Sequence, residues 1–226
     1  MVFRRLQYVE RSLRMNIAIL IYDGFTALDA IGPYEVLGCL PGAKIHFVAK
    51  QTGPVRAHTN ALSIVADYQL SDVPDPDIIV VSGGTRGTVA AAKDESILSW
   101  VRRAHETSKW TTSVCTGALI LGAAGLLQGL KATTHWYGKD LLSQFGAEYS
   151  TERVVHQGKI ITAAGVSSGI DMALNLVEKI AGKEMAQTIQ LIIEYDPQPP
   201  YDCGSIRKAD PAIIEMATQA ANVEFA

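Results

Sequence analysis

A cysteine stands where a predicted buried strand changes into a helix. The segment Thr112 to Gly117 reads Thr-Ser-Val-Cys-Thr-Gly, and a small-residue helical pattern begins at Ala118. A residue at such a junction sits on a tight turn facing the helix N-terminus, where free N–H groups stabilise a thiolate. Serine hydrolases present their nucleophile on the same kind of strand–turn–helix elbow. We therefore interpret Cys115 as a reactive thiol, although most lone cysteines are small buried hydrophobic residues.

A carboxyl group and a glycine-rich loop follow two other predicted strands. Asp29 precedes Gly32-Pro33, where we expect a helix to open. The residues alone leave two roles open: capping of that helix, or acid–base work beside the thiol. In Ser82-Gly83-Gly84-Thr85, backbone N–H groups could approach a developing negative charge. No G-x-G-x-x-G follows the first strand, which disfavours nucleotide binding.

Two further polar residues complete the predicted site. The backbone N–H of Thr116 could finish an oxyanion site, and its hydroxyl could hold a water or the substrate. His135, in Ala-Thr-Thr-His-Trp, is the best candidate for a catalytic histidine, yet a lone histidine beside a tryptophan is more often structural. No group of histidines, cysteines and carboxylates has metal-ligand spacing. We interpret Cys39 and Cys203 as ordinary small hydrophobic residues.

Strand and helix patterns alternate along the chain. The predicted strands are 16–22, 44–50, 77–82, 111–114 and 159–163; the predicted helices are 31–40, 94–107, 116–124, 138–145 and 168–181. Two hairpins, 55–67 and 154–161, break the alternation, and a proline-rich extended tail precedes a helix at 211–221. This order predicts an α/β fold with a doubly wound, mostly parallel sheet flanked by helices. Ligands of such sheets bind outside the carboxyl ends of the strands, which brings the loops named above around Cys115.

Size and composition predict one soluble domain. The chain has 226 residues, 48% of them hydrophobic, with a net charge of −3. That charge gives no reason to expect nucleic acid or an anionic membrane as a partner, and no run of roughly 18 apolar residues predicts a membrane span. Three widely spaced cysteines fit a reducing, cytoplasmic compartment without disulfides. Residues 1–14 are basic and lack an apolar signal-peptide core, so we expect an extension before one domain at 15–226.

Several motifs together resemble the ThiJ/PfpI family. They are Leu28-Asp29, Gly32-Pro33-Tyr34-Glu35-Val36-Leu37, Gly83-Gly84-Thr85, Ser113-Val114-Cys115-Thr116-Gly117 and Ala132-Thr-Thr-His-Trp136. The resemblance covers about residues 15–200 and implies the flavodoxin-like, class I glutamine amidotransferase-like fold. Within the family, the later segments are most similar to the isocyanide hydratases: Gly122 to Gly129, Gly165 to Asp171 and Leu191 to Pro200.

The resemblance also implies roles for individual residues. Cys115 matches the nucleophile of the hydratases, Asp29 matches their acidic partner, and Thr116 matches the threonine after the nucleophile. Val166 stands where the hydratases have another β-branched residue beside the active-site helix. The implied reaction hydrates R–N≡C to an N-substituted formamide through a covalent thioimidate on Cys115, with no metal or organic cofactor. Members of the family are expected to be homodimers.

Two other functions stay open. Glyoxalases and deglycases of the family share the nucleophile but normally carry Glu where Asp29 stands. AraC-type regulators carry very similar Ser-Val-Cys-Thr-Gly and Ala-Thr-Thr-His-Trp motifs in a ligand-sensing domain joined to a DNA-binding domain, which we do not expect here. A stand-alone ligand or redox sensor is the corresponding alternative. Protease-like members place His directly after the cysteine, where this chain has Thr116, and that departure argues against peptidase activity.

Overall fold

Seven strands form a single sheet at the centre of the molecule. The computed structural model describes residues 14–225, so the expected extension at 1–14 falls outside it apart from Arg14. The strands are β1 (Met15–Leu20), β2 (Ala43–Ala49), β5 (Tyr68–Gln69), β6 (Ile78–Val81), β7 (Trp110–Val114), β10 (Val154–Gln157) and β11 (Ile160–Ala163). Their order is β10-β11-β7-β6-β1-β2-β5. Neighbours are parallel except in the β10–β11 hairpin, so the predicted mostly parallel sheet is confirmed.

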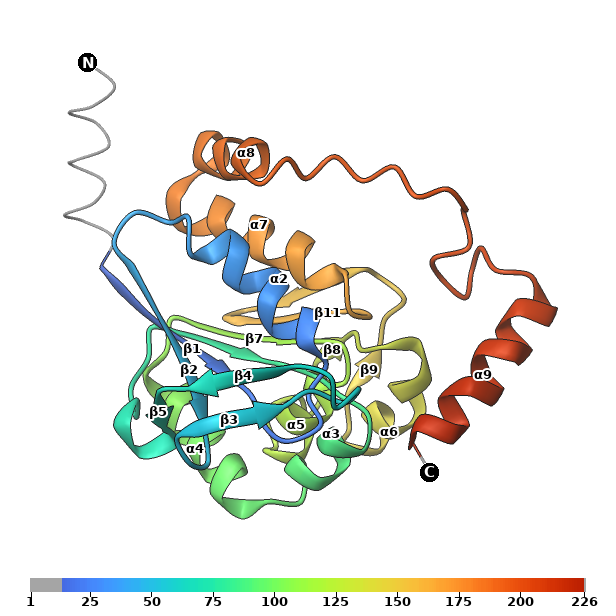
Figure 1. Cartoon of the computed structure of the whole chain (residues 1–226), viewed down its shortest axis with the longest axis horizontal. Helices are drawn as coiled ribbons and strands as arrows, with labels where there is room; N and C mark the ends of the chain where they lie inside the picture. The colour runs from blue at the N-terminus through green and yellow to red at the C-terminus, as the bar shows by residue number, and fades with distance from the viewer. Residues whose placement is uncertain (1–13, 226) are drawn as a thin grey trace.

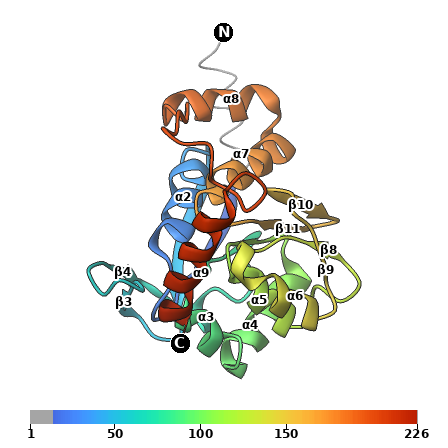
Figure 2. The same cartoon turned by 90° about the vertical axis from the view of Figure 1, so that its right-hand side faces the viewer.

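Helices cover both faces of the sheet, as Figures 1 and 2 show. One face carries α2 (Ala27–Leu37), α7 (Ser168–Ala181) and α8 (Lys183–Ile192), and the other carries α3 (Arg86–Ala91), α4 (Glu95–Thr107), α5 (Gly117–Ala123) and α6 (Lys139–Gln144). With helices on both sides, all four residues of β6 are buried. This explains why the central strands are continuous apolar runs and not alternating ones.

Short elements surround the main sheet. The predicted hairpin at 55–67 is confirmed as the antiparallel pair β3 (Gly53–Arg56) and β4 (Ser63–Ala66). A second small sheet, not predicted, pairs β8 (Lys131–Ala132) with β9 (Glu148–Tyr149). Two 3-10 turns, η1 (Leu70–Asp72) and η2 (Trp136–Gly138), complete this set, and η2 directly follows His135.

Helix α2 begins at Ala27 and not at Ile31 as predicted. The sequence predicts Pro33 at the helix start, the position that tolerates proline best, but Pro33 lies inside the helix. Proline has no N–H for the carbonyl of Asp29 one turn earlier, so the helix continues without that bond. The earlier start has a functional consequence, because Asp29 now belongs to the first helical turn and is fully buried.

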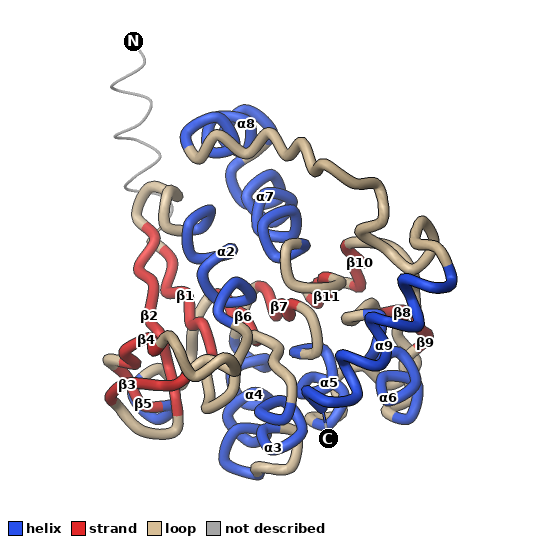
Figure 3. Tube along the Cα trace, turned by 45° about the vertical axis from the view of Figure 1, so that its right-hand side comes forward, coloured by secondary structure: helices blue, strands red, loops and turns tan. Residues whose placement is uncertain are grey.

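The C-terminal part of the chain leaves the body of the fold. Residues 194–210 form an irregular arm, and α9 (Pro211–Phe225) lies at its end, apart from α8 (Figure 3). The predicted tail and final helix are therefore confirmed, whereas α3 and α8 were not predicted.

Cys203 in the arm is exposed and Cys39 is half-buried, so the interpretation as a small buried hydrophobic residue is wrong for Cys203. Within residues 14–225, no helix is long and apolar enough to cross a membrane.

Candidate active site

Cys115 occupies a strained turn between β7 and α5. Its φ is 58°, a left-handed value that non-glycine residues seldom adopt. The turn is held on both sides: the Cys115 N–H donates to the carbonyl oxygens of Ala163 at 3.1 Å and Ala164 at 2.8 Å, and the Thr134 hydroxyl donates to the Cys115 carbonyl at 2.9 Å. Backbone strain maintained by surrounding hydrogen bonds is typical of functional sites. The structure thus places Cys115 at an elbow of the kind that its sequence position suggested.

Asp29 reaches this elbow from α2. Its Oδ2 accepts a hydrogen bond from the Gly83 N–H at 2.9 Å, and the carboxyl group does not cap its own helix, whose N-cap is Thr26. Its Oδ1 is buried and makes no hydrogen bond of ordinary geometry with the described residues. No side chain fits at Gly83, because a Cβ there would lie 2.8 Å from Asp29 Oδ2 and 2.6 Å from the Thr116 nitrogen. The geometry favours the acid–base interpretation of Asp29 over the capping one.

Burial controls the protonation of both groups. Loss of hydration raises the pKa of Asp29 to about 7, and the Gly83 N–H and the Cys115 thiol offset this only in part. Burial, with the nearby Asp29 carboxylate, also raises the pKa of the Cys115 thiol, while N–H groups of Val166 and Thr116 act in the opposite direction. The helix N-terminus therefore favours the thiolate as predicted, but desolvation outweighs it. The thiol therefore keeps its proton at neutral pH while Asp29 titrates there, so the pair holds two protons below about pH 7 and one above it.

Thr116 joins the elbow to the glycine loop after β6. Its hydroxyl donates to the Gly84 carbonyl oxygen at 2.6 Å and accepts from the Gly84 N–H at 3.0 Å. The Gly84 N–H is thus engaged with a protein group and is not the free oxyanion donor that we predicted. Thr85 follows as the half-buried N-cap residue of α3, and its substrate contact stays a prediction.

Val166 contributes its backbone to the site. It precedes α7 with a φ of 21°, unusual for a β-branched residue, and its N–H is one of the groups that favour the Cys115 thiolate. The sequence analysis, in contrast, singles out Val166 for its β-branched side chain.

His135 is half-buried. Its Nδ1 accepts a hydrogen bond from the Tyr137 N–H at 3.4 Å, and its ring occupies the space where a Cβ on Gly165 would lie, 2.8 Å from Cδ2. These contacts favour a wall position for His135 over a proton-transfer role.

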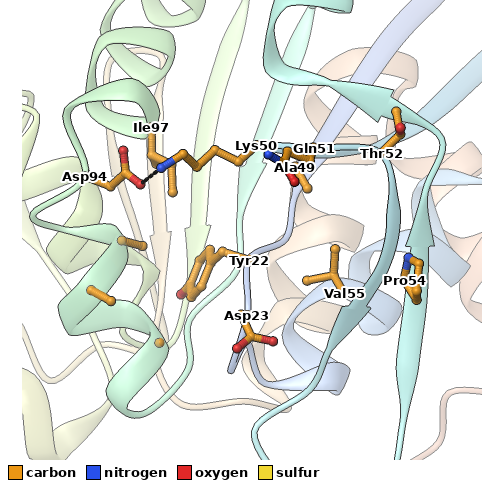
Figure 4. Close-up of a pocket in the computed structure, with 13 residues that line it drawn as sticks. Tyr22, Asp23, Ala49, Lys50, Gln51, Thr52, Pro54, Val55, Asp94 and Ile97 are labelled. Carbon is orange, nitrogen blue, oxygen red and sulfur yellow. Dashed lines mark hydrogen bonds and ion pairs between the residues drawn. The ribbon is translucent and has the colours of Figure 1, made fainter.

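Sequence reasoning missed a buried tyrosine behind the nucleophile. A cavity of about 500 Å³ lies at the carboxyl ends of β1 and β2, and Tyr22 forms part of its wall (Figure 4). The Tyr22 hydroxyl is hydrogen-bonded to the Ser82 carbonyl oxygen at 2.8 Å and lies 2.9 Å from the Thr88 hydroxyl. Burial raises the pKa of this phenol well above its usual value. The one available signal was the position of Tyr22 at the carboxyl end of the first predicted strand, on the ligand-binding edge of the sheet.

A mostly parallel α/β sheet with a cysteine elbow beside a buried carboxyl group defines a class of cysteine-nucleophile enzymes. The sequence profile of the DJ-1/PfpI family matches residues 15–179, and the chain belongs to this family. Within residues 14–225, no group of three or more His, Cys, Asp or Glu side chains could hold a metal ion.

Known relatives agree with this assignment. The isonitrile hydratase of Pseudomonas putida is 41% identical over 209 residues, which are 92% of this chain and 91% of that protein. The crystal structure of a ThiJ/PfpI family protein from Pseudomonas syringae has a TM-score of 0.88 at 40% identity, covering 94% of this chain and 90% of that one. DJ-1beta of Drosophila melanogaster shares the fold, with a TM-score of 0.74 at 22% identity over 80% of this chain and 98% of that one. The predicted family and fold class are confirmed.

Proposed function

We propose that this protein is an isocyanide hydratase, which converts R–N≡C and water into an N-substituted formamide. The observation that carries the proposal is the buried pair of Cys115 and Asp29, with an Asp29 pKa of about 7 and an Oδ1 that lacks a hydrogen bond of ordinary geometry in the described part of the chain. Such a carboxyl group can both give and take a proton near neutral pH. The similarity to the Pseudomonas putida isonitrile hydratase supports the same substrate class, isonitrile being another word for isocyanide.

The first step joins the nucleophile to the substrate. Sγ of Cys115 forms a bond to the terminal isocyanide carbon, and the proton shared by the pair moves through Asp29 to that carbon. The product is a thioimidate, R–N=CH–S–Cys115, and Asp29 is left as the carboxylate. Burial helps here, because the reacting thiolate loses no hydration shell when the substrate arrives.

The second step adds water. The Asp29 carboxylate accepts a proton from water while the water oxygen bonds to the thioimidate carbon. That proton then moves from Asp29 to the nitrogen, which gives R–NH–CH(OH)–S–Cys115. The C–S bond breaks with its electron pair on sulfur, the hydroxyl proton returns to Asp29, and R–NH–CHO leaves. The N–H groups of Thr116 and Val166, which favour the thiolate, stabilise the departing sulfur. Thr85 and His135, with the Gly84 backbone, form the substrate-facing wall of this site.

The test is an ultraviolet assay of formamide production from an aryl isocyanide, with methylglyoxal as the alternative substrate. Wild type should turn over the isocyanide, whereas Cys115→Ala should lose activity by at least about 10³-fold because the covalent route is gone. Asp29→Asn should lose about 10²-fold or more, as expected for a missing acid–base group. The exposed Cys203→Ala variant is the matched control and should keep full activity.

Other outcomes would contradict the proposal in defined ways. Consumption of methylglyoxal with no isocyanide turnover would favour a glyoxalase, and turnover of neither substrate would favour a ligand or redox sensor. Full activity of Cys115→Ala on the isocyanide would exclude the covalent mechanism.

The proposal extends to the surroundings of the enzyme. We place it in the cytoplasm as a homodimer, with one domain spanning residues 15–226 and a small-molecule substrate. The free cysteines, none of which forms a disulfide, suit a reducing compartment. Size-exclusion chromatography with light scattering tests the dimer directly.

A further inference from the structure

Three buried hydroxyl groups form a hydrogen-bonded chain that ends beside the nucleophile. Tyr22 follows β1, Thr88 lies in α3, and Thr116 follows the nucleophile. The Thr88 Oγ1 lies 2.9 Å from the Tyr22 hydroxyl and 2.9 Å from the Thr116 Oγ1. Each hydroxyl has a single proton, and a carbonyl oxygen competes with the neighbouring hydroxyl for it: the Ser82 oxygen lies 2.8 Å from the Tyr22 hydroxyl, and the Gly84 oxygen lies 2.6 Å from Thr116 Oγ1 and 3.0 Å from Thr88 Oγ1.

The Thr116 hydroxyl has one proton, which it can donate either to the Gly84 carbonyl oxygen or to the Cys115 sulfur. In the thiol state the short contact directs this proton to the Gly84 carbonyl. Once Cys115 becomes a thiolate, the sulfur is the stronger acceptor, and the Thr116 side chain is among the groups that stabilise it. If the proton turned away without a substitute, a buried carbonyl would lose its donor, which is costly. The second hydroxyl on that carbonyl, from Thr88, prevents this loss.

We propose that Thr88 is a positioning residue for the reaction: its hydroxyl keeps the Gly84 carbonyl hydrogen-bonded while the Thr116 hydroxyl turns to the Cys115 thiolate. The inference deepens the proposed function, since it concerns the same nucleophile. Tyr22 holds the Thr88 side chain in this position from the other side, because its hydroxyl lies 2.9 Å from the Thr88 Oγ1.

Among the titratable groups around the thiol, Tyr22 contacts Thr88 directly and belongs to the hydroxyl chain, whereas Asp29 is held by the Gly83 N–H. Asp29 approaches from α2, and Tyr22 approaches from the end of β1; both interact with Cys115. His135 precedes η2 and packs against Gly165. A change in the pH profile of a Thr88 variant therefore reports on the hydroxyl chain.

The experiment measures how fast iodoacetamide alkylates Cys115 across the neutral and alkaline pH range. Mass spectrometry of the Cys115 peptide separates this reaction from alkylation of Cys39 and Cys203. In Thr88→Val, which keeps the shape but removes the hydroxyl, the apparent pKa of Cys115 should rise by about 1 and the rate at neutral pH should fall about 10-fold. The kcat for isocyanide hydration should fall by a similar factor with little change in KM. Thr88→Ser, which keeps the hydroxyl, should restore the wild-type profile.

A matched control removes a buried hydroxyl outside the chain. Thr112 in β7 donates to the Ile79 carbonyl at 2.8 Å, and Thr112→Val should leave the alkylation profile unchanged. The proposal is wrong if the profiles of Thr88→Val and wild type coincide, or if Thr88→Ser shifts the profile as far as Thr88→Val does. Should Thr88→Val fail to fold, Thr88→Ala makes the same test without added bulk. Alkylation needs no turnover, so the result stands even if wild type hydrates no isocyanide.

Discussion

Burying a carboxyl group costs free energy, because its ionised form loses the water that stabilised it. Asp29 is completely buried and receives one backbone hydrogen bond, from Gly83, on one of its two oxygens. A carboxyl group that served only the fold would gain more from hydrogen bonds to both oxygens. In the proposed mechanism this unfavourable burial has a use, because it keeps a proton available beside the thiol near neutral pH, as is common for catalytic groups.

This burial predicts a pH-dependent cost that Asp29→Asn removes. The pKa of Asp29 is raised from 3.8 to about 7, so between these values the unfolded chain has released a proton that the folded protein still holds. The folded state gains from this group below pH 3.8 and loses that gain as pH rises to about 7. The free energy of unfolding of wild type relative to Asp29→Asn should thus fall by about 4 kcal/mol over this range. Urea denaturation at a series of pH values measures it.

Asp94 offers a control of opposite sign. Its ion pair with Lys50 and its hydrogen bonds to Ser96 lower its pKa to about 2, so its contribution is present above the ordinary value and lost as pH falls. Wild type relative to Asp94→Asn should therefore gain stability with rising pH. If the free energy of unfolding of wild type relative to each variant changed with pH in the same direction for both, Asp29 would not be held protonated by burial.

Position along the chain predicted some site residues and could not predict others. Cys115 and Asp29 follow predicted strands, and the carboxyl ends of strands meet at one edge of the sheet, so their proximity could be expected. Thr88 owes its place beside the site to contacts with Tyr22 and Thr116, and Thr134 to a hydrogen bond with Cys115, all of them residues distant in the sequence. Neither residue type nor periodicity encodes such bonds. The raised pKa of the thiol was missed for a related reason, because burial depends on the packing of the whole site.

At the scale of elements, apolar runs located five strands of the main sheet within two residues of their observed bounds. Helices were harder to predict. The start of α2 was misplaced because one proline inside a helix resembles a proline at a helix start. Helix α8 begins directly after Gly182, which ends α7 with a φ of 86°, and this glycine was the available signal for a second helix.

The approach of α5 to β6 depends on Gly117. A Cβ at this position would lie 2.2 Å from the Val81 carbonyl oxygen, and no side-chain movement can relieve a clash with backbone. Gly117→Ala should therefore lower the free energy of unfolding by about 1–3 kcal/mol, and it should reduce activity because the shift falls beside the elbow. Gly138→Ala is the control: this glycine is also buried, but its added Cβ would meet only ordinary contacts, beginning at 3.4 Å. Urea midpoints of the two variants that coincide would contradict this account.

At the scale of the whole molecule, the two helical layers leave the carboxyl edge of the sheet as the place where distant segments meet. Asp29 lies in α2 and Thr88 in α3, helices that cover opposite faces of the sheet (Figure 1), and Cys115 directly follows the strand β7. The stability of the sheet can therefore support a strained and poorly hydrated site at its edge. The C-terminal arm and α9 stand outside this layered body.

Removal of α9 should leave this body intact. None of its residues 211–222 is buried, and Ile213 and Met216 are 46% and 67% exposed. Its described contacts include a hydrogen bond from the Tyr137 hydroxyl to Asn222. A chain ending at Asp210 should therefore lose less than about 1 kcal/mol in its free energy of unfolding, since stabilisation follows the apolar area buried. Urea denaturation at several protein concentrations tests this, because a lower midpoint that depends on concentration would instead place α9 in an interface between two copies, where its apolar residues gain the burial that one chain does not give them.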